Sequence, residues 1–216
     1  MKPYGYFVII IHIQNIKGGE AMTYEDLKRF ADPEPITTER LTLRKLTRAD
    51  AQDVYKYASD GRVTEYLLWS PHTTVQHSRR YLMLLEKKYR RCEFYDWGVE
   101  YNGHIIGTCG FTSFSVENQS AEVGYVLGYD AWGQGIAAEA LRAVIKYGFE
   151  VLGLNRIEGR YMKGNDRSLS VMKKCAMTYE GMLRSSVFAK GAYRDVCVCS
   201  ILKSEYNNAQ KLGILP

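Results

Sequence analysis

Residues 120–153 constrain the fold of this chain more than any other stretch. Residues 122–127 are mostly apolar and favour a β-strand, after which Gly133 and Gly135 break the pattern. Apolar side chains then recur at the spacing of a helix with one buried face: Ala140, Val144, Tyr147 and Val151. Gly153 is suited to end that helix. The stretch therefore predicts a strand, a glycine turn and an amphipathic helix in direct succession.

The glycine turn is suited to binding an anion. The first amides of a helix have no acceptor within it, and the helix dipole adds partial positive charge there. Gly133 and Gly135 carry no Cβ that would block a close approach. The backbone of residues 134–138 is therefore a candidate phosphate site. An ordinary strand-to-helix turn is the alternative, because the third glycine of a Rossmann fingerprint and the Gly-Lys-Ser/Thr of a P-loop are both missing.

Three more helices are predicted from caps and spacing. Thr47 and Asp50 have the spacing of a capping box, so a helix should run to about residue 59. Its inward side chains are predicted to be Val54, Tyr55 and Ala58. A second helix should begin at residues 73–74, and a third should cover residues 165–175.

Strand signals fill the rest of the chain. Asn102-Gly103 is a strong hairpin signal, and Lys190-Gly191 predicts a second, closing hairpin. The predicted strands cover residues 41–43, 96–101, 104–111, 121–127, 156–162, 184–189 and 193–202. This order predicts an α+β fold with a mixed, mostly antiparallel central sheet flanked by helices.

Length and composition indicate one globular domain. The chain has 216 residues, a net charge of +5 and five cysteines without a C-x-x-C pair. An odd number of unpaired cysteines favours free thiols in a reducing cytosol, so we expect a cytoplasmic protein. The four histidines have no ligand spacing, so no metal site is predicted. We place the domain at residues 38–206, with an extension at 1–37 and a tail at 207–216.

The first 21 residues fit poorly with the rest of the chain. The apolar run at residues 7–13 is too short to span a bilayer, which needs about 20 residues, so no membrane segment is predicted. One alternative is an extra strand, and another is a contact surface. A third alternative is that residues 1–21 are a non-native leader and that Met22 is the physiological start.

Residues 132–141, WGQGIAAEAL, resemble the acyl-CoA loop of the GNAT superfamily of N-acetyltransferases. They are most similar to the W-G-x-G-x-A-x-E-A form in the branch that includes the bacterial ribosomal-protein N-terminal acetyltransferases. Trp132 stands where the superfamily more often has Gln or Arg, which removes a polar side chain near the diphosphate. Ala176 replaces a glycine of that branch, so the end of its helix is expected to differ locally. The resemblance covers residues 38–206.

The resemblance implies acetyl-CoA as cosubstrate and a site for it. In this family the strand before the glycine turn separates from its neighbour and pairs with the pantetheine amides. A linear diamide arm suits an exposed strand edge, and a diphosphate suits a helix N-terminus. The implied cofactor-binding residues are Tyr125, Val126, Leu127, Gln134, Gly135, Ile136, Ala137, Ala138, Asn165 and Ser168.

Two residues are implied as catalytic. Glu122 matches the family's strand glutamate and would remove a proton from the amine, directly or through water. Its alternative is a structural carboxylate paired with a lysine or arginine. Ser168 would protonate or stabilise the departing thiolate, because the tyrosine that many members place a turn later is Met172 here. Asn165 and Ser168 could also act only as helix caps.

The acceptor amine is left open by the sequence. An α-amine with a pKa of about 7.7 to 8.0 needs only a modest base for its deprotonation, whereas a lysine with a pKa of about 10.4 needs a stronger one. A protein N-terminus is therefore the first hypothesis, a small amine or antibiotic the second, and a non-catalytic CoA-binding protein the third. Candidate acceptor-binding residues are Tyr66, Trp69, Phe114 and Tyr193.

Other partners are not indicated. The basic run at residues 86–91 fits a solvated helix end better than a nucleic-acid site, because cations there complement the helix dipole. The oligomeric state is open, with a homodimer among the alternatives.

Overall fold

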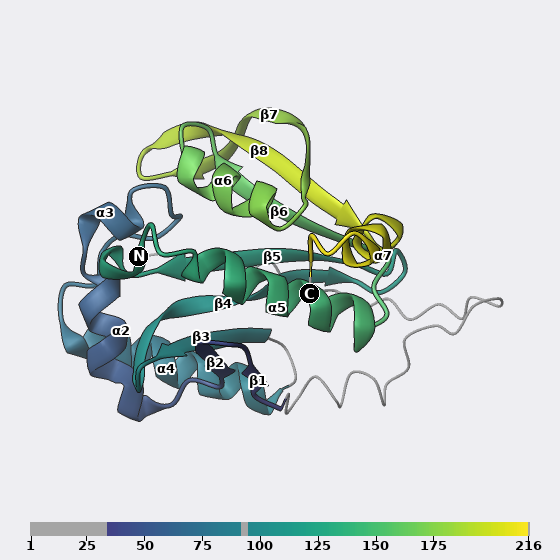
Figure 1. The fold of residues 1–216 in the computed structure, drawn as a ribbon. Coiled ribbons are helices and arrows are strands. Elements are labelled where there is room, and N and C mark those ends of the chain that lie inside the picture. Colours follow the sequence, from purple (N-terminus) through teal and green to yellow (C-terminus); the bar gives the residue numbers. More distant parts are fainter. Residues whose placement is uncertain (1–33, 92–94, 216) are drawn as a thin grey trace.

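An eight-stranded sheet organises the part of the chain that the structure describes, residues 34–91 and 95–215 of a computed structural model (Figure 1). Its strands in spatial order are β1 (Ile36–Thr37), β2 (Leu41–Arg44), β3 (Tyr95–Tyr101), β4 (His104–Ser115), β5 (Ser120–Leu127), β6 (Arg156–Met162), β8 (Ala192–Leu202) and β7 (Thr178–Ala189). Neighbouring strands are antiparallel except β5 and β6, which are parallel. This confirms the predicted α+β fold. The predictions for residues 1–21 lie outside the described residues.

Helices cover both faces of the sheet (Figure 1). The helical elements are η1 (Arg48–Asp50), α2 (Ala51–Ala58), α3 (Gly61–Thr64), α4 (Val75–Arg90), η2 (Tyr129–Ala131), α5 (Ile136–Glu150), α6 (Asp166–Lys174) and α7 (Lys203–Lys211). On β5, Leu127 belongs to the hydrophobic core under α5, and Val126 packs against the core of α2 and α4. Because consecutive strand residues point to opposite faces, α5 lies on one face and α2 and α4 on the other.

Several local predictions are confirmed. The Thr47 amide donates to Asp50 Oδ2 at 2.7 Å, as in a capping box, and the helical turn continues into α2. Asn102 and Gly103 have φ angles of 51° and 77°, which is the left-handed conformation that the hairpin turn requires. Gly153 has a φ of 66° just beyond α5.

Other local predictions are wrong. Tyr57 rather than Tyr55 is among the buried residues of α2, because the face that contacts α4 follows the i, i+3, i+4 positions from Val54. Val151 is 53% exposed, because α5 ends at Glu150. Strands β4 and β7 are longer than predicted, and β1 was not predicted.

The fold continues past residue 206. α7 packs Tyr206 and Ala209 into the core under α5, and Leu215 joins them. The Tyr206 hydroxyl donates to Glu150 Oε1 at 2.7 Å, which fixes α7 against the end of α5.

Ala176 keeps the backbone conformation that a glycine would take. Its φ is 57°, directly after α6, where the Ala176 amide donates to the Lys173 carbonyl at 3.1 Å. Left-handed backbone costs a residue with a Cβ about 1 kcal/mol. We therefore expect Ala176→Gly to raise the free energy of unfolding by about 1 kcal/mol, measured by urea denaturation. An unchanged or lower stability would show that the methyl group contributes packing that offsets the strain.

Candidate active site

The parallel pairing of β5 with β6 stops halfway along both strands. Cα partners run from Ser120 with Arg156 to Val123 with Gly159. Beyond these residues β5 stays paired with β4 as far as Leu127, and β6 stays paired with β8 as far as Met162. Figure 1 shows the two strands diverging. The predicted cofactor-binding residues Tyr125, Val126 and Leu127 lie along this β5–β6 opening.

The glycine turn leads from the open end of β5 into α5. Gly133 and Gly135 have φ angles of 76° and 77°, so both adopt the left-handed conformation. The Glu139 amide donates to the Gly135 carbonyl at 3.1 Å. The amides that precede it in the first turn have no acceptor within the helix. These amides belong to Gly135, Ile136, Ala137 and Ala138, and Gln134 directly precedes them; all five are predicted cofactor-binding residues.

Arg40 holds this turn in place from the other side. Its Nη1 donates to the Gln134 carbonyl at 3.1 Å, and its Nε donates to Glu139 Oε2 at 2.7 Å. The Thr38 hydroxyl donates to Glu139 Oε1 at 2.6 Å. Glu139 is therefore a hydrogen-bonding residue of the scaffold.

Ser168 and Tyr125 meet across the opening. The Tyr125 hydroxyl lies 2.7 Å from Ser168 Oγ and 2.9 Å from the Ser168 carbonyl oxygen. The Asn165 side chain accepts from the Ser168 amide at 3.2 Å and so caps α6. Capping is thus one role of Asn165, while the Ser168 hydroxyl is engaged by Tyr125. Met172 is buried against Gly159 and has no proton to donate.

Glu122 lies on β5 among charged side chains of β6. Arg160 Nε is 3.2 Å from Glu122 Oε2, and Arg160 Nη2 is 2.8 Å from Glu158 Oε1. Burial raises the pKa of Glu122; Arg160 opposes this and Glu158 adds to it. Glu122 thus has the arginine partner that a purely structural carboxylate would have, which supports that alternative in part. A raised pKa nevertheless makes this carboxylate a better base than a solvated glutamate.

Two contacts span the opening at its mouth. The Arg167 guanidinium of α6 lies 4.6 Å from the ring centroid of Trp132, and the Trp132 Nε1 donates to the Leu127 carbonyl at 2.9 Å. The Lys190 Nζ on the β7–β8 hairpin donates to the Thr64 carbonyl at 2.5 Å. The hairpin and the end of α3 are thereby held together.

The predicted acceptor residues do not all gather in one place. The Tyr66 hydroxyl lies beside Gly164, which precedes α6, and Trp69 packs against the core of α2 and α4. Tyr193 is 69% exposed, with its ring 5.1 Å from that of Phe188. Phe114 packs with Phe111 against the core under α5, on the face opposite Glu122. We therefore leave Phe114 out of the acceptor wall.

Sequence reasoning missed three contributions to the site. The side chain of Tyr125, the guanidinium of Arg160 and the anchor formed by Arg40 were not identified. Their partners lie 38 to 99 residues away in the chain, so no local motif marks them. Alternation along β5 does place Tyr125 on the face of Val123, which is the one available signal.

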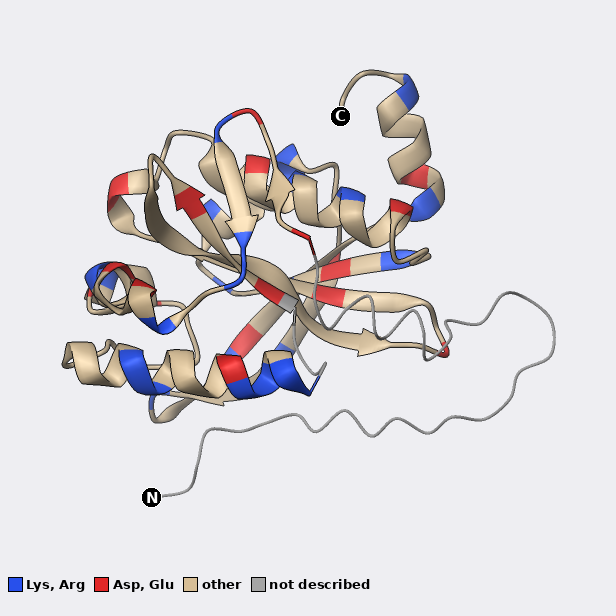
Figure 2. Cartoon of the chain, turned by 90° about the horizontal axis from the view of Figure 1, so that it is seen from below, with Lys and Arg blue, Asp and Glu red and all other residues tan. Residues whose placement is uncertain are grey.

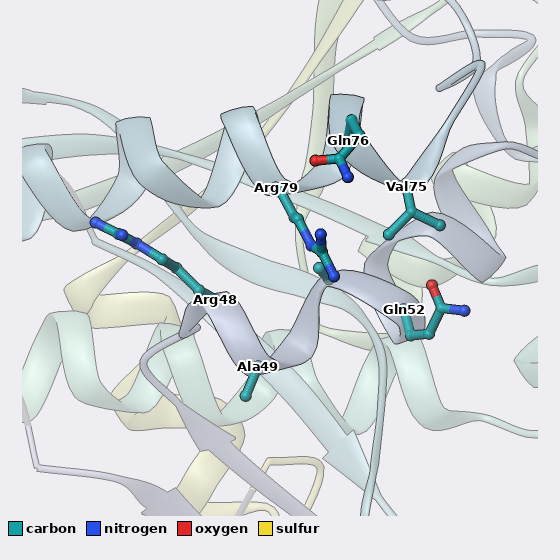
Figure 3. A pocket seen from close by; sticks show the side chains of 7 residues that line it. Arg48, Ala49, Gln52, Val75, Gln76 and Arg79 are labelled. Carbon is teal, nitrogen blue, oxygen red and sulfur yellow. The ribbon is translucent and has the colours of Figure 1, made fainter.

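Two surface features of α2 and α4 lie away from the opening. One hollow between η1–α2 and α4 is lined by Arg48, Ala49, Ala51, Gln52, Val75, Gln76 and Arg79 (Figure 3). Arg48 there is already paired with Glu86 at 2.8 Å. Lys87, Lys88 and Arg90 gather in the last turn of α4 (Figure 2), where they complement the helix dipole.

Residues 34–91 and 95–215 offer neither a metal site nor a membrane-spanning helix. They contain no group of three or more His, Cys, Asp and Glu residues arranged to hold a metal ion. No helix in these ranges has the length and apolar character to cross a membrane.

Relatives in sequence share the whole domain. The p20 protein of Bacillus licheniformis, named as an uncharacterized N-acetyltransferase, is 40% identical over 178 residues, which is 80% of this chain and 98% of p20. YdaF of Bacillus subtilis, whose name describes a candidate ribosomal N-acetyltransferase, is 26% identical over 78% of this chain and 94% of YdaF. Spermidine N(1)-acetyltransferase of Vibrio cholerae is 25% identical over 78% and 96%.

The family model and the solved structures agree with these relatives. A GNAT-family acetyltransferase from Bacillus anthracis superimposes with a TM-score of 0.70 at 27% identity, covering 79% of this chain and 99% of that one. The model of the acetyltransferase (GNAT) domain matches residues 40–178. On these matches, the chain belongs to the GNAT family and is an N-acetyltransferase.

Proposed function

We propose that this enzyme transfers the acetyl group of acetyl-CoA to a protein N-terminal α-amine. The observation that carries the proposal is the end of β5–β6 pairing at Val123 and Gly159, with the free start of α5 directly beyond β5. A strand edge can pair with the amides of a ligand, and the helix N-terminus that follows it can bind a diphosphate.

The described residues fit such a ligand. A Cβ at Gly133 would meet nothing within 4 Å, so there is free space beside the backbone of the turn at this residue. Arg167 lies at the mouth of the opening and would add a cation near the diphosphate. Acetyl-CoA, when bound, supplies an acetyl thioester that an amine can attack. Asn165, which caps α6, and Ser168 within α6 would border its thiol end.

Glu122 would accept the proton that the amine loses, directly or through one water. Its side chain is 26% exposed, so a water can reach it, and burial raises its pKa above that of a solvated glutamate. Arg160 holds the carboxylate in place at 3.2 Å. Ser168 would protonate or stabilise the departing thiolate, since the side chain of Met172 has no proton to donate.

The base strength favours an α-amine as acceptor. A glutamate that shares Arg160 with Glu158 remains a modest base. An α-amine with a pKa of about 7.7 to 8.0 is partly neutral at pH 7, whereas a lysine at about 10.4 is not. The name of YdaF, a relative across most of the chain, describes a ribosomal N-acetyltransferase and so supports a protein as acceptor.

A small polyamine is the second candidate. It is favoured by the relative named spermidine N(1)-acetyltransferase and by three carboxylates near Arg156 and Arg160: Glu122 on β5, Glu158 on β6 and Glu180 on β7. Against it, each of these carboxylates already has an arginine partner within 3.2 Å, so little negative charge is left for a polycation.

Ligand-induced stabilisation tests the cosubstrate. Acetyl-CoA at about 100 times its Kd should stabilise the folded state by about 2.7 kcal/mol, seen as a rise in Tm. Gly133→Asp should abolish this rise, because it adds a negative charge on the open side of the glycine turn. Gly153→Asp is the matched control, since both glycines have positive φ and neither has backbone close to its Cβ position. A wild-type protein without any rise would contradict the proposal.

An acceptor panel tests the second substrate. Peptides with a free N-terminus should release CoA thiol and gain one acetyl group on the α-amine, located by mass spectrometry. N-terminally blocked peptides with lysine, and spermidine, should react far more slowly. Faster reaction of spermidine would establish the polyamine alternative, and binding without thiol release would establish a non-catalytic protein.

A further inference from the structure

The Tyr125 hydroxyl has no role in the proposed function, although it lies at the centre of the opening. Tyr125 is on β5 and Ser168 is on α6, so their contact joins the two sides that diverge. The phenol oxygen has two partners on one residue, the Ser168 hydroxyl at 2.7 Å and the Ser168 carbonyl at 2.9 Å. Tyr125 thus lies beside the hydroxyl that would meet the thiolate.

Ser168 alone is poorly matched to the task of protonating a thiolate. A serine hydroxyl is a far weaker acid than a thiol, so transfer of its proton to sulfur runs uphill. A phenol, with an ordinary pKa near 10, is a far stronger acid than a serine hydroxyl, and it remains the stronger acid when burial raises its pKa, as it does for Tyr125. Proton transfer is efficient when donor and acceptor have similar pKa values. A phenol behind Ser168 would reduce the mismatch.

The other candidate donors nearby are less suited. Met172, one turn after Ser168, is buried against Gly159 and carries no acidic proton. The Cys175 thiol is within hydrogen-bond range of the Ala138 carbonyl at 3.5 Å, and burial raises its pKa to about 12. The Tyr66 hydroxyl lies beside Gly164 and is retained as the competing candidate.

The two acceptors of Tyr125 allow a switch of hydrogen bonds. While the phenol donates to the Ser168 carbonyl, the Ser168 hydroxyl donates to the phenol oxygen. If the phenol turns to donate to Ser168 Oγ, the serine proton becomes free to point elsewhere. Both distances are already within hydrogen-bond range, so no backbone movement is required. Burial raises the pKa of Tyr125, although its bond to Ser168 opposes this, so the phenol is protonated at neutral pH.

We propose that Tyr125 protonates the departing CoA thiolate through Ser168, an inference that rests on the proposed function. As the carbon–sulfur bond breaks, its electron pair stays on sulfur. Ser168 Oγ gives its proton to sulfur and takes the proton of Tyr125, and the phenolate is reprotonated by water. The proton that the amine loses leaves through Glu122 to solvent, so protons balance over one turnover.

The test measures the thiol pKa of CoA bound to the enzyme, from the ultraviolet absorbance of the thiolate. In the wild-type complex this pKa should lie below that of free CoA, because Ser168 and Tyr125 together stabilise the thiolate. Tyr125→Phe keeps the ring and should raise the bound thiol pKa while leaving the Kd for CoA unchanged. With acetyl-CoA and a peptide acceptor, its kcat should fall about 10- to 100-fold.

Further variants separate the relay from a structural effect. Ser168→Ala should raise the thiol pKa in the same way, and the double variant should be no worse than the more impaired single one, because both act on one proton. Tyr206→Phe is the matched control, since it also deletes a buried tyrosine hydroxyl, one that is bonded to Glu150 on α5. Its kcat and bound thiol pKa should match those of the wild type.

The outcomes discriminate between the proposals. An unchanged thiol pKa in Tyr125→Phe, with acetylation intact, overturns the relay and leaves the proposed function standing. A rise in Tyr66→Phe but not in Tyr125→Phe overturns it in favour of Tyr66. Failure of CoA to bind the wild-type protein overturns the proposed function and the relay together.

Discussion

Glu122→Gln is expected to lower kcat at least about 10²-fold, while the Kd for acetyl-CoA stays unchanged. Glutamine keeps the shape of the side chain and its contact with Arg160, but it cannot accept a proton. The cofactor contacts proposed for β5 and α5 use backbone groups, so they remain. Single-turnover kinetics with a peptide acceptor and calorimetry with acetyl-CoA measure the two quantities separately.

The pH dependence of kcat/KM shows whether Glu122 must be deprotonated for activity. Glu122 acts as a base only when deprotonated, and burial raises its pKa above the ordinary value of 4.5. The wild-type rate should therefore fall on the acid side at a pH above that of a solvated glutamate. In Glu122→Gln this limb should disappear, and only the ionisation of the acceptor amine should remain.

Glu158→Gln is the matched control for this prediction. Glu158 is the Cα partner of Glu122 in the parallel pairing and shares Arg160 with it. Its negative charge contributes to the raised pKa of Glu122. Removing that charge should move the acid limb to lower pH and leave the maximal kcat nearly unchanged. If Glu122→Gln instead behaves like Glu158→Gln, Glu122 is a structural carboxylate.

Much of the site was predictable because its parts are local in sequence. The strand, the glycine turn and the start of α5 follow one another within residues 120–153, so spacing alone indicates how they connect. The capping box of Thr47 and Asp50 and the Asn102-Gly103 hairpin are also local signals. The end of β5–β6 pairing was expected only from the family resemblance.

The parts that were missed depend on register and on distant partners. β4 has an irregularity against β5 between Phe111 and Ser113, and such a shift changes which residues face the same side. Counting along the sequence therefore could not show that Phe114 faces α5. The contact of Tyr125 with Ser168 spans 43 residues and depends on where α6 lies against the open strand.

The fold that carries the site also depends on a partly buried ion pair. Arg44 on β2 donates from Nη1 and Nη2 to the two carboxylate oxygens of Asp50, at 3.1 and 2.9 Å, and from Nε to Glu100 on β3. Asp50 is 9% exposed, in the turn that starts α2. Burial alone would raise the pKa of Asp50, but the bonds from Arg44 and Thr47 outweigh it and lower that pKa. Arg44 therefore stabilises a charge that is largely shielded from water.

Arg44→Met is accordingly expected to lower the free energy of unfolding by about 3 kcal/mol at neutral pH, because it leaves the Asp50 carboxylate buried without a cation. Arg48→Met, which breaks the exposed pair with Glu86, should cost less than about 1 kcal/mol. Urea denaturation of both variants measures the difference. Arg44→Met combined with Asp50→Asn should recover part of the loss, since the uncompensated charge is then gone.

The pH dependence of this loss identifies its cause. In the wild type the pKa of Asp50 is lowered by folding, so its contribution is present above the unfolded value of about 3.9 and disappears as the pH falls through the folded value. In Arg44→Met burial acts without the cation, so the folded pKa should be raised instead. Stability is then retained at low pH and lost as the pH rises through that folded value. The deficit of the variant relative to wild type should therefore be smaller near pH 4 than near pH 7. An equal deficit at both pH values would mean that Arg44 stabilises the fold through packing and its bond to Glu100, and not through the charge of Asp50.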